Sequence, residues 1–358
     1  MISLLLFGCF LGLLVLSVPV AISLGLASSV ALLYSGKVSS SYIAQGLVTA
    51  IDSFPLMAVP FFILAGELMG QGGLSRRLLS VANVFFGRYT GGLAIIAVVT
   101  CLFFAAISGS GPATVAAIGG LLLPAMAREG YDKGFSVGLL ASAGSIGIII
   151  PPSIPMIIYA VAANVSITQM FLAGVIPGLT IGIALMLVAY FKARKEGYTG
   201  SSKRYSASEI FAAVWDAKWA LMVPVIILGG IYGGIFTPTE SAAVGVIYGF
   251  IVGVFVYREI KLKDLYKVIV DASLTSATVI VIVGTATIFG RVLAIERIPF
   301  MLADYIVSLT DSRILILLLI NLLLIFVGMF METLAAIIIL VPILLPVVVA
   351  VGVDPVHF

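Results

Sequence analysis

Ser108-Gly-Ser-Gly-Pro-Ala-Thr114 interrupts a long apolar stretch that covers residues 92–126. Gly328-Met-Phe-Met-Glu-Thr333 interrupts a second apolar stretch, 314–351, in the same way. Glycine and proline break helices, and backbone groups freed inside hydrocarbon have to be paired or have to line a polar cavity. Each stretch is therefore either two full membrane spans or one re-entrant helical hairpin whose tip lies at membrane depth.

The composition assigns the chain to the membrane. Of its 358 residues, 62% are hydrophobic and 10% are charged, whereas soluble domains carry about 25% charged residues. Lipid admits only helices and closed barrels, and unbroken apolar runs such as 334–351 differ from alternating barrel strands. We therefore predict an all-α membrane protein, a polytopic helical bundle. The further predicted spans are Ile2–Ser17, Val20–Tyr34, Ile43–Met69, Val137–Asn164, Gln169–Phe191, Trp219–Phe236, Ser241–Tyr257 and Val268–Leu293.

Other features of the composition carry little functional signal. The net charge of +3 suggests no nucleic-acid partner. Cys9 and Cys101 lie in apolar segments and are expected to be small core residues, without a disulfide or metal framework. The first apolar segment has no basic region before it and no clear cleavage site, so a retained span is predicted in place of a signal peptide.

Lysine and arginine positions favour one interpretation of the interrupted stretches. If both are re-entrant hairpins, 15 of the 19 basic residues fall on one side of the membrane. Cytoplasmic loops collect basic residues, so this side is the cytoplasm, and Met1 is predicted on the periplasmic side of a bacterial inner membrane. Two full spans in the first stretch would move residues 128–133 outside and weaken this asymmetry. The four exceptions are Lys37, Arg291, Arg297 and Arg313.

An internal repeat is visible at a constant shift of 222 residues (346 − 124 = 222). The same shift moves three predicted spans before residue 70 onto the three that end at Phe236, Tyr257 and Leu293. Coincidence between apolar runs is the alternative. With the charge distribution, the shift predicts two repeats of inverted topology, each with a re-entrant hairpin and a broken transmembrane helix, as in secondary transporters. The matched pairs are Pro124 and Pro346, Gly130 and Gly352, and Asp132 and Asp354.

The predicted organisation has three parts. Residues 1–195 form the first repeat, with two scaffold spans, a third span, the hairpin, a broken helix and a closing span. Residues 196–218 form a cytoplasmic linker, and its segment 205–218 is predicted as an amphipathic helix on the membrane surface. Residues 219–358 form the second repeat. The shift would place a partner of Pro151-Pro152 near residue 373, so roughly 55 residues, including the broken helix, are expected to be missing from it.

The first break is rich in oxygen ligands. Ser108, Ser110 and the freed carbonyls around them suit Na⁺, a hard cation that prefers oxygen. The helix that restarts near Ala113 directs the positive end of its dipole at an anion. A helix-packing interface of small residues is the alternative, but such packing does not require Pro112.

Two further features lie at membrane depth. Another break is expected at Gly147-Ile-Ile-Ile-Pro-Pro-Ser153, because adjacent prolines remove two backbone donors; a purely structural kink is the alternative. Glu332 is costly there unless it is protonated, paired or close to water. For Asp52 and Glu67, a scaffold role is as well supported as a transport role.

At these motifs the sequence resembles the large membrane subunit of tripartite ATP-independent periplasmic (TRAP) transporters, over nearly the whole chain. The family's C-terminal segment, with its own proline-pair break, is not in this sequence. The motifs that carry the resemblance are Asp52-Ser-Phe-Pro, Phe61-Phe-Ile-Leu-Ala-Gly66, Ser108–Thr114, Gly147–Ser153, Gly233-Gly-Ile-Phe-Thr-Pro-Thr-Glu240 and Gly328–Thr333.

The resemblance implies an elevator-type secondary active transporter that couples Na⁺ to the uptake of a small organic anion, usually a carboxylate. It also implies a small four-helix membrane subunit, a periplasmic substrate-binding protein, and no cofactor besides the coupling ion. The implied Na⁺ ligands are Ser108, Ser110, Gly147 and Ile150 in one site and Gly328 and Thr333 in another. The implied substrate contacts are Ser110, Thr114, Pro152, Ser153 and Thr333.

Other functions stay open from the residues alone. The permease of an ATP-driven importer would need a separate ATPase, because the chain has no Walker motif. An ion channel would conduct without saturable uptake. An intramembrane protease is disfavoured, because Ser110 has no histidine on a second helix to activate it. We therefore predict a transporter subunit and not an enzyme.

Overall fold

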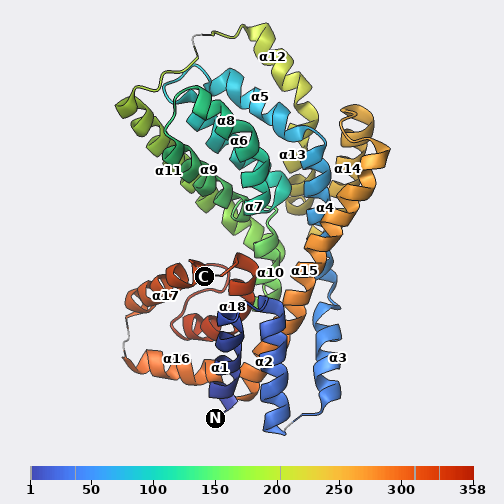
Figure 1. Ribbon diagram of the computed structural model, residues 1–358, viewed down its shortest axis with the longest axis vertical. Helices are drawn as coiled ribbons and strands as arrows, with labels where there is room; N and C mark the ends of the chain where they lie inside the picture. The colour runs from blue at the N-terminus through green and yellow to red at the C-terminus, as the bar shows by residue number, and fades with distance from the viewer. Residues whose placement is uncertain (1, 37, 202, 310–311, 330) are drawn as a thin grey trace. The chain divides into compact units, whose positions relative to one another are not determined.

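The computed structural model describes residues 2–36, 38–201, 203–309, 312–329 and 331–358, and the regular elements in these ranges are all helical (Figure 1). The predicted all-α class is confirmed. By length and composition, five described helical segments could cross a membrane, or up to six if one bent pair is a single span. The five are Phe54–Gln71, Ile167–Glu196, Pro238–Val256, Leu262–Ile295 and Thr333–Ala350, and the bent pair is Ala207–Asp216 with Lys218–Tyr232.

Most of the predicted spans coincide with helices of similar bounds. The predicted span 169–191 is longer in the structure, because its helix starts earlier and continues to a charged end at Glu196. These helices are α1 (Ile2–Val15), α2 (Val20–Ser35), α11 (Ile167–Glu196), α13 (Lys218–Tyr232), α14 (Pro238–Ile251, followed by the π-helical turn Val252–Val256) and α15 (Leu262–Ile295).

The prediction of one continuous span over 43–69 is wrong. The segment forms α3 (Ser40–Ile51), a 3-10 turn (Phe54–Met57) and α4 (Ala58–Gln71). Pro55 has no N–H to continue the ladder of helix hydrogen bonds, and it disfavours helical geometry at the residue before it. The chain therefore turns at this position before the helix resumes.

Two helices were not predicted from the sequence. They are α5 (Leu74–Phe86) and α16 (Ile298–Leu309). Arg76 and Arg77 make α5 too polar for a membrane span, and its apolar residues follow a helical spacing on one face only. A search for long apolar runs does not detect a short amphipathic helix such as α5. The helix α16 has only 12 residues and is also too short for such a search.

Two compact units divide the chain, and each is described by itself. One unit comprises Met1–Leu56, Ile157–Ser166 and Leu274–Phe358, and the other comprises Met57–Met156 and Ile167–Ser273. The predicted repeat boundaries at residues 195 and 219 stay a prediction.

A helical hairpin forms the centre of the second unit. It consists of α6 (Gly92–Ser108), the short α7 (Gly111–Thr114), a π-helical turn (Val115–Gly119) and α8 (Gly120–Arg128). Ala94 near the start of α6 and Met126 near the end of α8 share one buried apolar cluster. The two arms therefore run antiparallel and pack against each other (Figure 1). The chain reverses at the predicted break.

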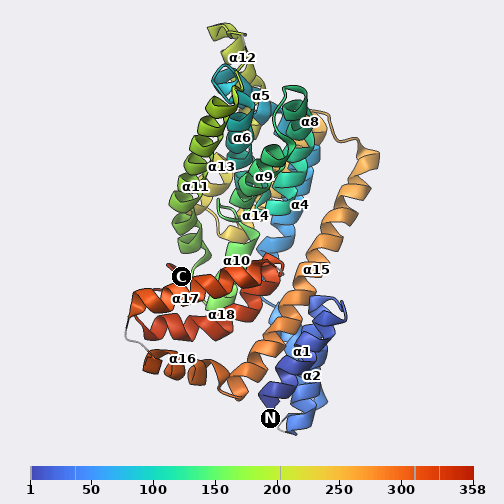
Figure 2. The same cartoon turned by 60° about the vertical axis from the view of Figure 1, so that its left-hand side comes forward.

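A second hairpin lies in the other unit. Its arms are α17 (Arg313–Gly328) and α18 (Thr333–Ala350), which run side by side (Figure 2). Ile316 near the start of α17 and Val347 near the end of α18 belong to one buried cluster. The reversal coincides with the predicted break, in which residue 330 lies outside the described residues.

The ends of the two hairpins repeat in backbone detail. Gly130 and Gly352 both have a φ of +77°, in the left-handed region that favours glycine. One residue later, the N–H of Tyr131 bonds to the Met126 carbonyl at 3.0 Å, and that of Val353 bonds to the Val348 carbonyl at 2.9 Å. Each pair of equivalent residues is 222 apart, as the sequence shift requires. Their relative orientation in a membrane stays a prediction.

The helix predicted to break at the proline pair is divided into three pieces. They are α9 (Lys133–Gly144), a 3-10 turn (Ser145–Ile148) and α10 (Ile154–Ala163). Residues 149–153 between the last two pieces have no regular structure. The Ile154 N–H bonds to the Gly109 carbonyl at 3.2 Å. This bond attaches Ile154, the first residue after the break, to the tip of the first hairpin.

Two glycines of α11, Gly174 and Gly178, let this helix approach the break closely, while Gly182 lies against the Leu102 side chain of α6. A Cβ added to Gly174 would lie 2.5 Å from the Ile149 carbonyl oxygen, and one added to Gly178 would lie 2.7 Å from the Ile150 side chain. For a Cβ added to Gly138 on α9, in contrast, the described part of the chain has no atom within 4 Å.

Gly174→Ala is therefore expected to lower the free energy of unfolding by about 1–3 kcal/mol, because a rigid carbonyl has to move. Gly138→Ala is the matched control, and it should change stability by less than about 1 kcal/mol, or raise it, because alanine favours the helix. Thermal unfolding of the detergent-solubilised chain measures both. Equal midpoints for the two variants would contradict the close approach.

Candidate functional site

The tip of the first hairpin is built by its own sequence. Ser110 has extended backbone geometry (φ −135°, ψ 125°), and its hydroxyl accepts a hydrogen bond from the Ala113 N–H at 3.4 Å. Pro112 fits the first turn of a helix, where an N–H has no partner to lose. Gly109 has a φ of +60°, and a Cβ there would lie 2.6 Å from the Pro152 carbonyl oxygen. Both constraints require glycine at this position.

Three oxygen atoms gather at this tip. The Thr114 hydroxyl donates to the Ser110 carbonyl at 2.8 Å, and the hydroxyls of Ser108 and Thr114 are 3.0 Å apart. The Ser108 hydroxyl also lies 3.3 Å from the Ser110 carbonyl. Ser108 is 3% exposed and Thr114 is fully buried. We call these three atoms, Ser108 Oγ, Ser110 O and Thr114 Oγ1, the oxygen cluster.

The break at 147–153, before and at the proline pair, meets the oxygen cluster at Gly147. A Cβ on Gly147 would lie 2.6 Å from Thr114 Oγ1 and 2.8 Å from the Ser110 carbonyl oxygen. Only a glycine, which has no Cβ, leaves room for these two oxygens. Two helix breaks that are more than 30 positions apart along the chain therefore form one local structure.

A third element, α4, closes one side of the tip. A Cβ on Gly66 would lie 3.3 Å from Ser108 Cα and 3.4 Å from the Ser108 carbonyl oxygen. Sequence reasoning did not assign a role to Gly66. Its only local signal was a glycine inside an apolar helical run, which does not reveal what the glycine packs against.

The predicted residues around the first break divide into two groups. The structure brings Ser108, Ser110, Thr114 and Gly147 together. The Pro152 carbonyl lies against Gly109, while the Ser153 hydroxyl donates to the Ile148 carbonyl at 2.6 Å. The side chain of Ile150 packs against Gly178 of α11.

The second tip, in the other unit, is built around a carboxylate. Glu332 is the N-cap of α18, and its Oε2 accepts hydrogen bonds from the N–H groups of Leu334 at 2.9 Å and Ala335 at 3.1 Å. These bonds satisfy two of the free donors of the helix end. Thr333 begins α18, and among the described residues no atom lies within 4 Å of a Cβ added to Gly328. Their predicted role as ligands stays a prediction.

Glu332→Ala is expected to lower the free energy of unfolding by about 1 kcal/mol, because it removes a helix N-cap. Glu332→Gln should restore most of that loss, since the amide oxygen can accept the same two hydrogen bonds. Denaturation of the purified chain in detergent compares the variants. A Gln variant as unstable as the Ala variant would show that charge, and not capping, is the contribution of Glu332.

The chemical capacity of the first site follows from its atoms. The oxygen cluster consists of two hydroxyls and one carbonyl, which carry no net charge and offer several lone pairs. Broken helices with unwound carbonyls and hydroxyls at membrane depth coordinate monovalent cations in transporters. The arrangement therefore suits a hard monovalent cation better than a catalytic reaction.

Comparison with known proteins gives a consistent family match. The sequence profile of the family described as "Tripartite ATP-independent periplasmic transporter, DctM component" matches residues 7–358. The isethionate TRAP transporter permease protein DctMQ of Oleidesulfovibrio alaskensis is 54% identical over 353 residues, which are 99% of this chain and 56% of that protein. The chain thus spans little more than half of this relative.

Two other relatives match over most of both chains. The C4-dicarboxylate TRAP transporter large permease protein DctM of Rhodobacter capsulatus is 40% identical over 370 residues, covering 99% of this chain and 84% of its own length. The sialic acid TRAP transporter large permease protein SiaM of Vibrio cholerae is 42% identical over 349 residues, covering 98% and 82%.

A solved structure shares the fold. The crystal structure of the Alcanivorax borkumensis YdaH transporter aligns with a TM-score of 0.59 at 17% identity, covering 88% of this chain and 74% of that chain. At this identity the likeness concerns the fold alone.

Proposed function

Since the chain belongs to the DctM component family of tripartite ATP-independent periplasmic transporters, we propose that it is the large membrane subunit of a secondary active uptake system. Its matched relatives are named permease proteins, which confirms both the family resemblance and the prediction that the chain is not an enzyme. The proposal goes further, because it assigns a driving ion, a class of substrate and partners to this chain.

Na⁺ is the proposed coupling ion. The observation that carries this proposal is the meeting of two helix breaks, which places the oxygen cluster against Gly147. A cation bound there would attract an anionic substrate, so ion and substrate would travel together in an elevator movement. The proposed Na⁺ ligands are Ser108, Ser110, Gly147 and Ile150, with Gly328 and Thr333 in a second site.

The proposed substrate is a small organic anion of the carboxylate type. Four solutes appear in the names of relatives: C4-dicarboxylate, sialic acid and 2,3-diketo-L-gulonate are carboxylates and isethionate is a sulfonate, and all four are organic anions at neutral pH. Hydroxyl and backbone groups beside a bound cation suit such an anion. The proposed substrate contacts are Ser110, Thr114, Pro152, Ser153 and Thr333.

The proposed membrane arrangement rests on charge. Two inverted repeats with re-entrant hairpins would place 15 of the 19 basic residues in the cytoplasm of a bacterial cell and the N-terminus in the periplasm. The antiparallel arms of both hairpins, and the repeat of 222 residues at their ends, support this arrangement.

Two partners are proposed. One is a small four-helix membrane subunit, and the other is a periplasmic protein that delivers the substrate. The name DctMQ of the isethionate relative, together with its greater length, supports a small subunit fused to the large one in that protein. We propose a separate or fused equivalent for this chain.

Uptake in sealed vesicles that contain the large subunit and both partners tests the function. We expect saturable uptake of the anion that requires an inward Na⁺ gradient and survives removal of ATP, and we expect Ser110→Ala to impair it. Uptake that requires ATP and ignores Na⁺ would favour an ATP-driven importer. Ion currents without saturable uptake would favour a channel, and either result would end the coupling proposal.

A further inference from the structure

An exposed row of aromatic side chains runs along α12 (Ala207–Asp216) into α13. Phe211 and Trp215 are one helical turn apart on the same side of α12, and Trp219 follows four residues later at the start of α13. Their exposed fractions are 68%, 60% and 38%, and the rings of Phe211 and Trp215 stack at 6.0 Å. Three large rings in water are unfavourable, so a partner is expected to cover this aromatic row.

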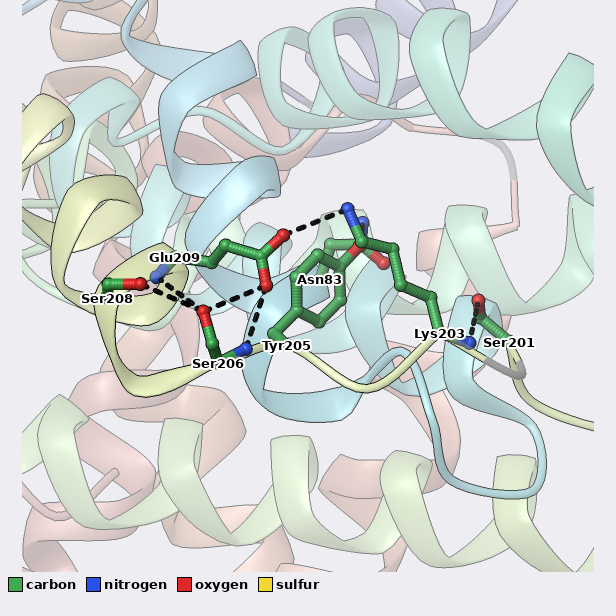
Figure 3. Close-up of polar contacts among 7 residues, drawn as sticks. All are labelled: Asn83, Ser201, Lys203, Tyr205, Ser206, Ser208 and Glu209. Atoms are coloured by element: carbon green, nitrogen blue, oxygen red, sulfur yellow. Dashed lines mark hydrogen bonds and ion pairs between the residues drawn. The ribbon is translucent and has the colours of Figure 1, made fainter.

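A capping box holds the start of α12 (Figure 3). Ser206 accepts from the Glu209 N–H at 3.3 Å, and the Glu209 carboxylate accepts from the Ser206 N–H at 2.8 Å. The bond from the Ser206 N–H, together with the Lys203 ammonium at 3.2 Å, lowers the pKa of Glu209. The Tyr205 hydroxyl accepts from the Asn83 side chain of α5 at 3.0 Å.

The end of α12 is fixed as firmly. The helix meets α13 at a bend of 55°. The Tyr257 hydroxyl donates to the Asp216 carbonyl at 2.9 Å, and the Tyr248 hydroxyl donates to the Trp219 carbonyl at 2.7 Å. These two hydrogen bonds hold the backbone on both sides of the bend.

Arg77 of α5 adds a charged contact at the same bend. Its guanidinium lies 3.3 Å from the Asp216 carboxylate and 3.2 Å from Glu259, and it stacks 3.6 Å from the centre of the Tyr257 ring. The acid at the C-terminal end of α12 is therefore paired inside the unit. Glu209, at the other end, is paired with Lys203.

The charged side chain beside the aromatic row that has no ion pair among those described is a lysine. The Lys218 ammonium lies 3.5 Å from the centre of the Trp215 ring and 5.6 Å from that of Trp219. Among the ion pairs of the described residues, none includes Lys218. A cation among rings, with the nearby acids already paired, is complementary to an anionic surface.

We propose that the aromatic row and Lys218 form an anchor for the surface of a bilayer that contains anionic phospholipids. Tryptophan and other aromatic rings prefer the headgroup level, where an apolar body and a polar edge are both satisfied. Each lysine near an anionic leaflet contributes attraction worth roughly a fivefold change in binding. The anchor holds the linker at the membrane surface and is independent of the ion site.

The chain offers a direct probe, because its two tryptophans are both in the row. Trp219→Phe leaves Trp215 as the sole tryptophan. In vesicles, spin-labelled lipids with the label near the headgroup should quench Trp215 more than lipids labelled near the end of the acyl chain, and aqueous iodide should quench it weakly. Stronger quenching by the deep label would make α12 part of a span and overturn the proposal.

Brominated lipids test the anionic preference in the same variant. Brominated phosphatidylglycerol should quench Trp215 with roughly fivefold higher relative affinity than brominated phosphatidylcholine, and Lys218→Gln should abolish the difference. Lys263→Gln, an exposed lysine of the same unit, is the matched control and should leave it unchanged. Equal affinities for the two lipids, or loss of lipid quenching when the small membrane subunit is present, would overturn the proposal.

Discussion

Gly147→Ala is expected to raise the Na⁺ concentration for half-maximal uptake by roughly five- to 150-fold. The added methyl would lie 2.6 Å from Thr114 Oγ1 and 2.8 Å from the Ser110 carbonyl oxygen, so both oxygens have to move apart. Overpacking of this kind costs about 1–3 kcal/mol, and 1.4 kcal/mol corresponds to a tenfold change in affinity. Na⁺ titration of uptake in vesicles measures the effect.

Gly138→Ala on α9 provides the control for this substitution. It adds the same methyl group in the same unit, at a position where no atom of residues 2–36, 38–201, 203–309, 312–329 and 331–358 lies within 4 Å. Its Na⁺ dependence should match that of the unmodified chain. If Gly147→Ala changed only the amount of folded protein, and the Na⁺ dependence of the remaining uptake stayed normal, Gly147 would have a purely structural role.

Thr114→Val is expected to raise the half-saturating Na⁺ concentration by roughly tenfold. Valine keeps the shape of threonine but removes a hydroxyl that donates to the Ser110 carbonyl at 2.8 Å and lies 3.0 Å from the Ser108 hydroxyl. The loss of one hydrogen bond of a buried cluster costs about 1–3 kcal/mol, because its partners are left unsatisfied. The same vesicle titration provides the measurement.

Thr100→Val supplies a control of identical chemistry. Thr100 is also fully buried, on α6, but its hydroxyl forms no hydrogen bond within the described part of the chain. Replacing an unpaired buried hydroxyl by a methyl should leave stability unchanged or raise it. A comparable rise in the half-saturating Na⁺ concentration for both variants would show that the effect does not originate in the oxygen cluster.

The helix breaks were predictable because their causes are local. Gly109 and Pro112 end one helix and begin another within four residues, and the proline pair 151–152 removes two successive donors. The amphipathic linker helix was predictable for the same reason, since Ser206 and Glu209 form a capping box. These signals lie inside single segments of sequence.

Contacts between segments were not predictable from such signals. Nothing in the run around Gly66 indicates that it faces Ser108, and nothing near Gly147 identifies Thr114 as its neighbour. The sequence of α5 was passed over because Arg77 makes it polar, although this arginine pairs with Asp216 and Glu259. These contacts depend on tertiary packing, which cannot be deduced from the local sequence pattern.

Na⁺ binding to the purified chain, measured at equilibrium with radioactive Na⁺ in the absence of substrate and partners, tests the central claim most directly. We predict saturable binding that competes poorly with K⁺, is retained in Gly138→Ala, and is lost or strongly weakened in Gly147→Ala and Thr114→Val. Equal Na⁺ binding by all four proteins would contradict the account, because the meeting of the two breaks would then not form the cation site.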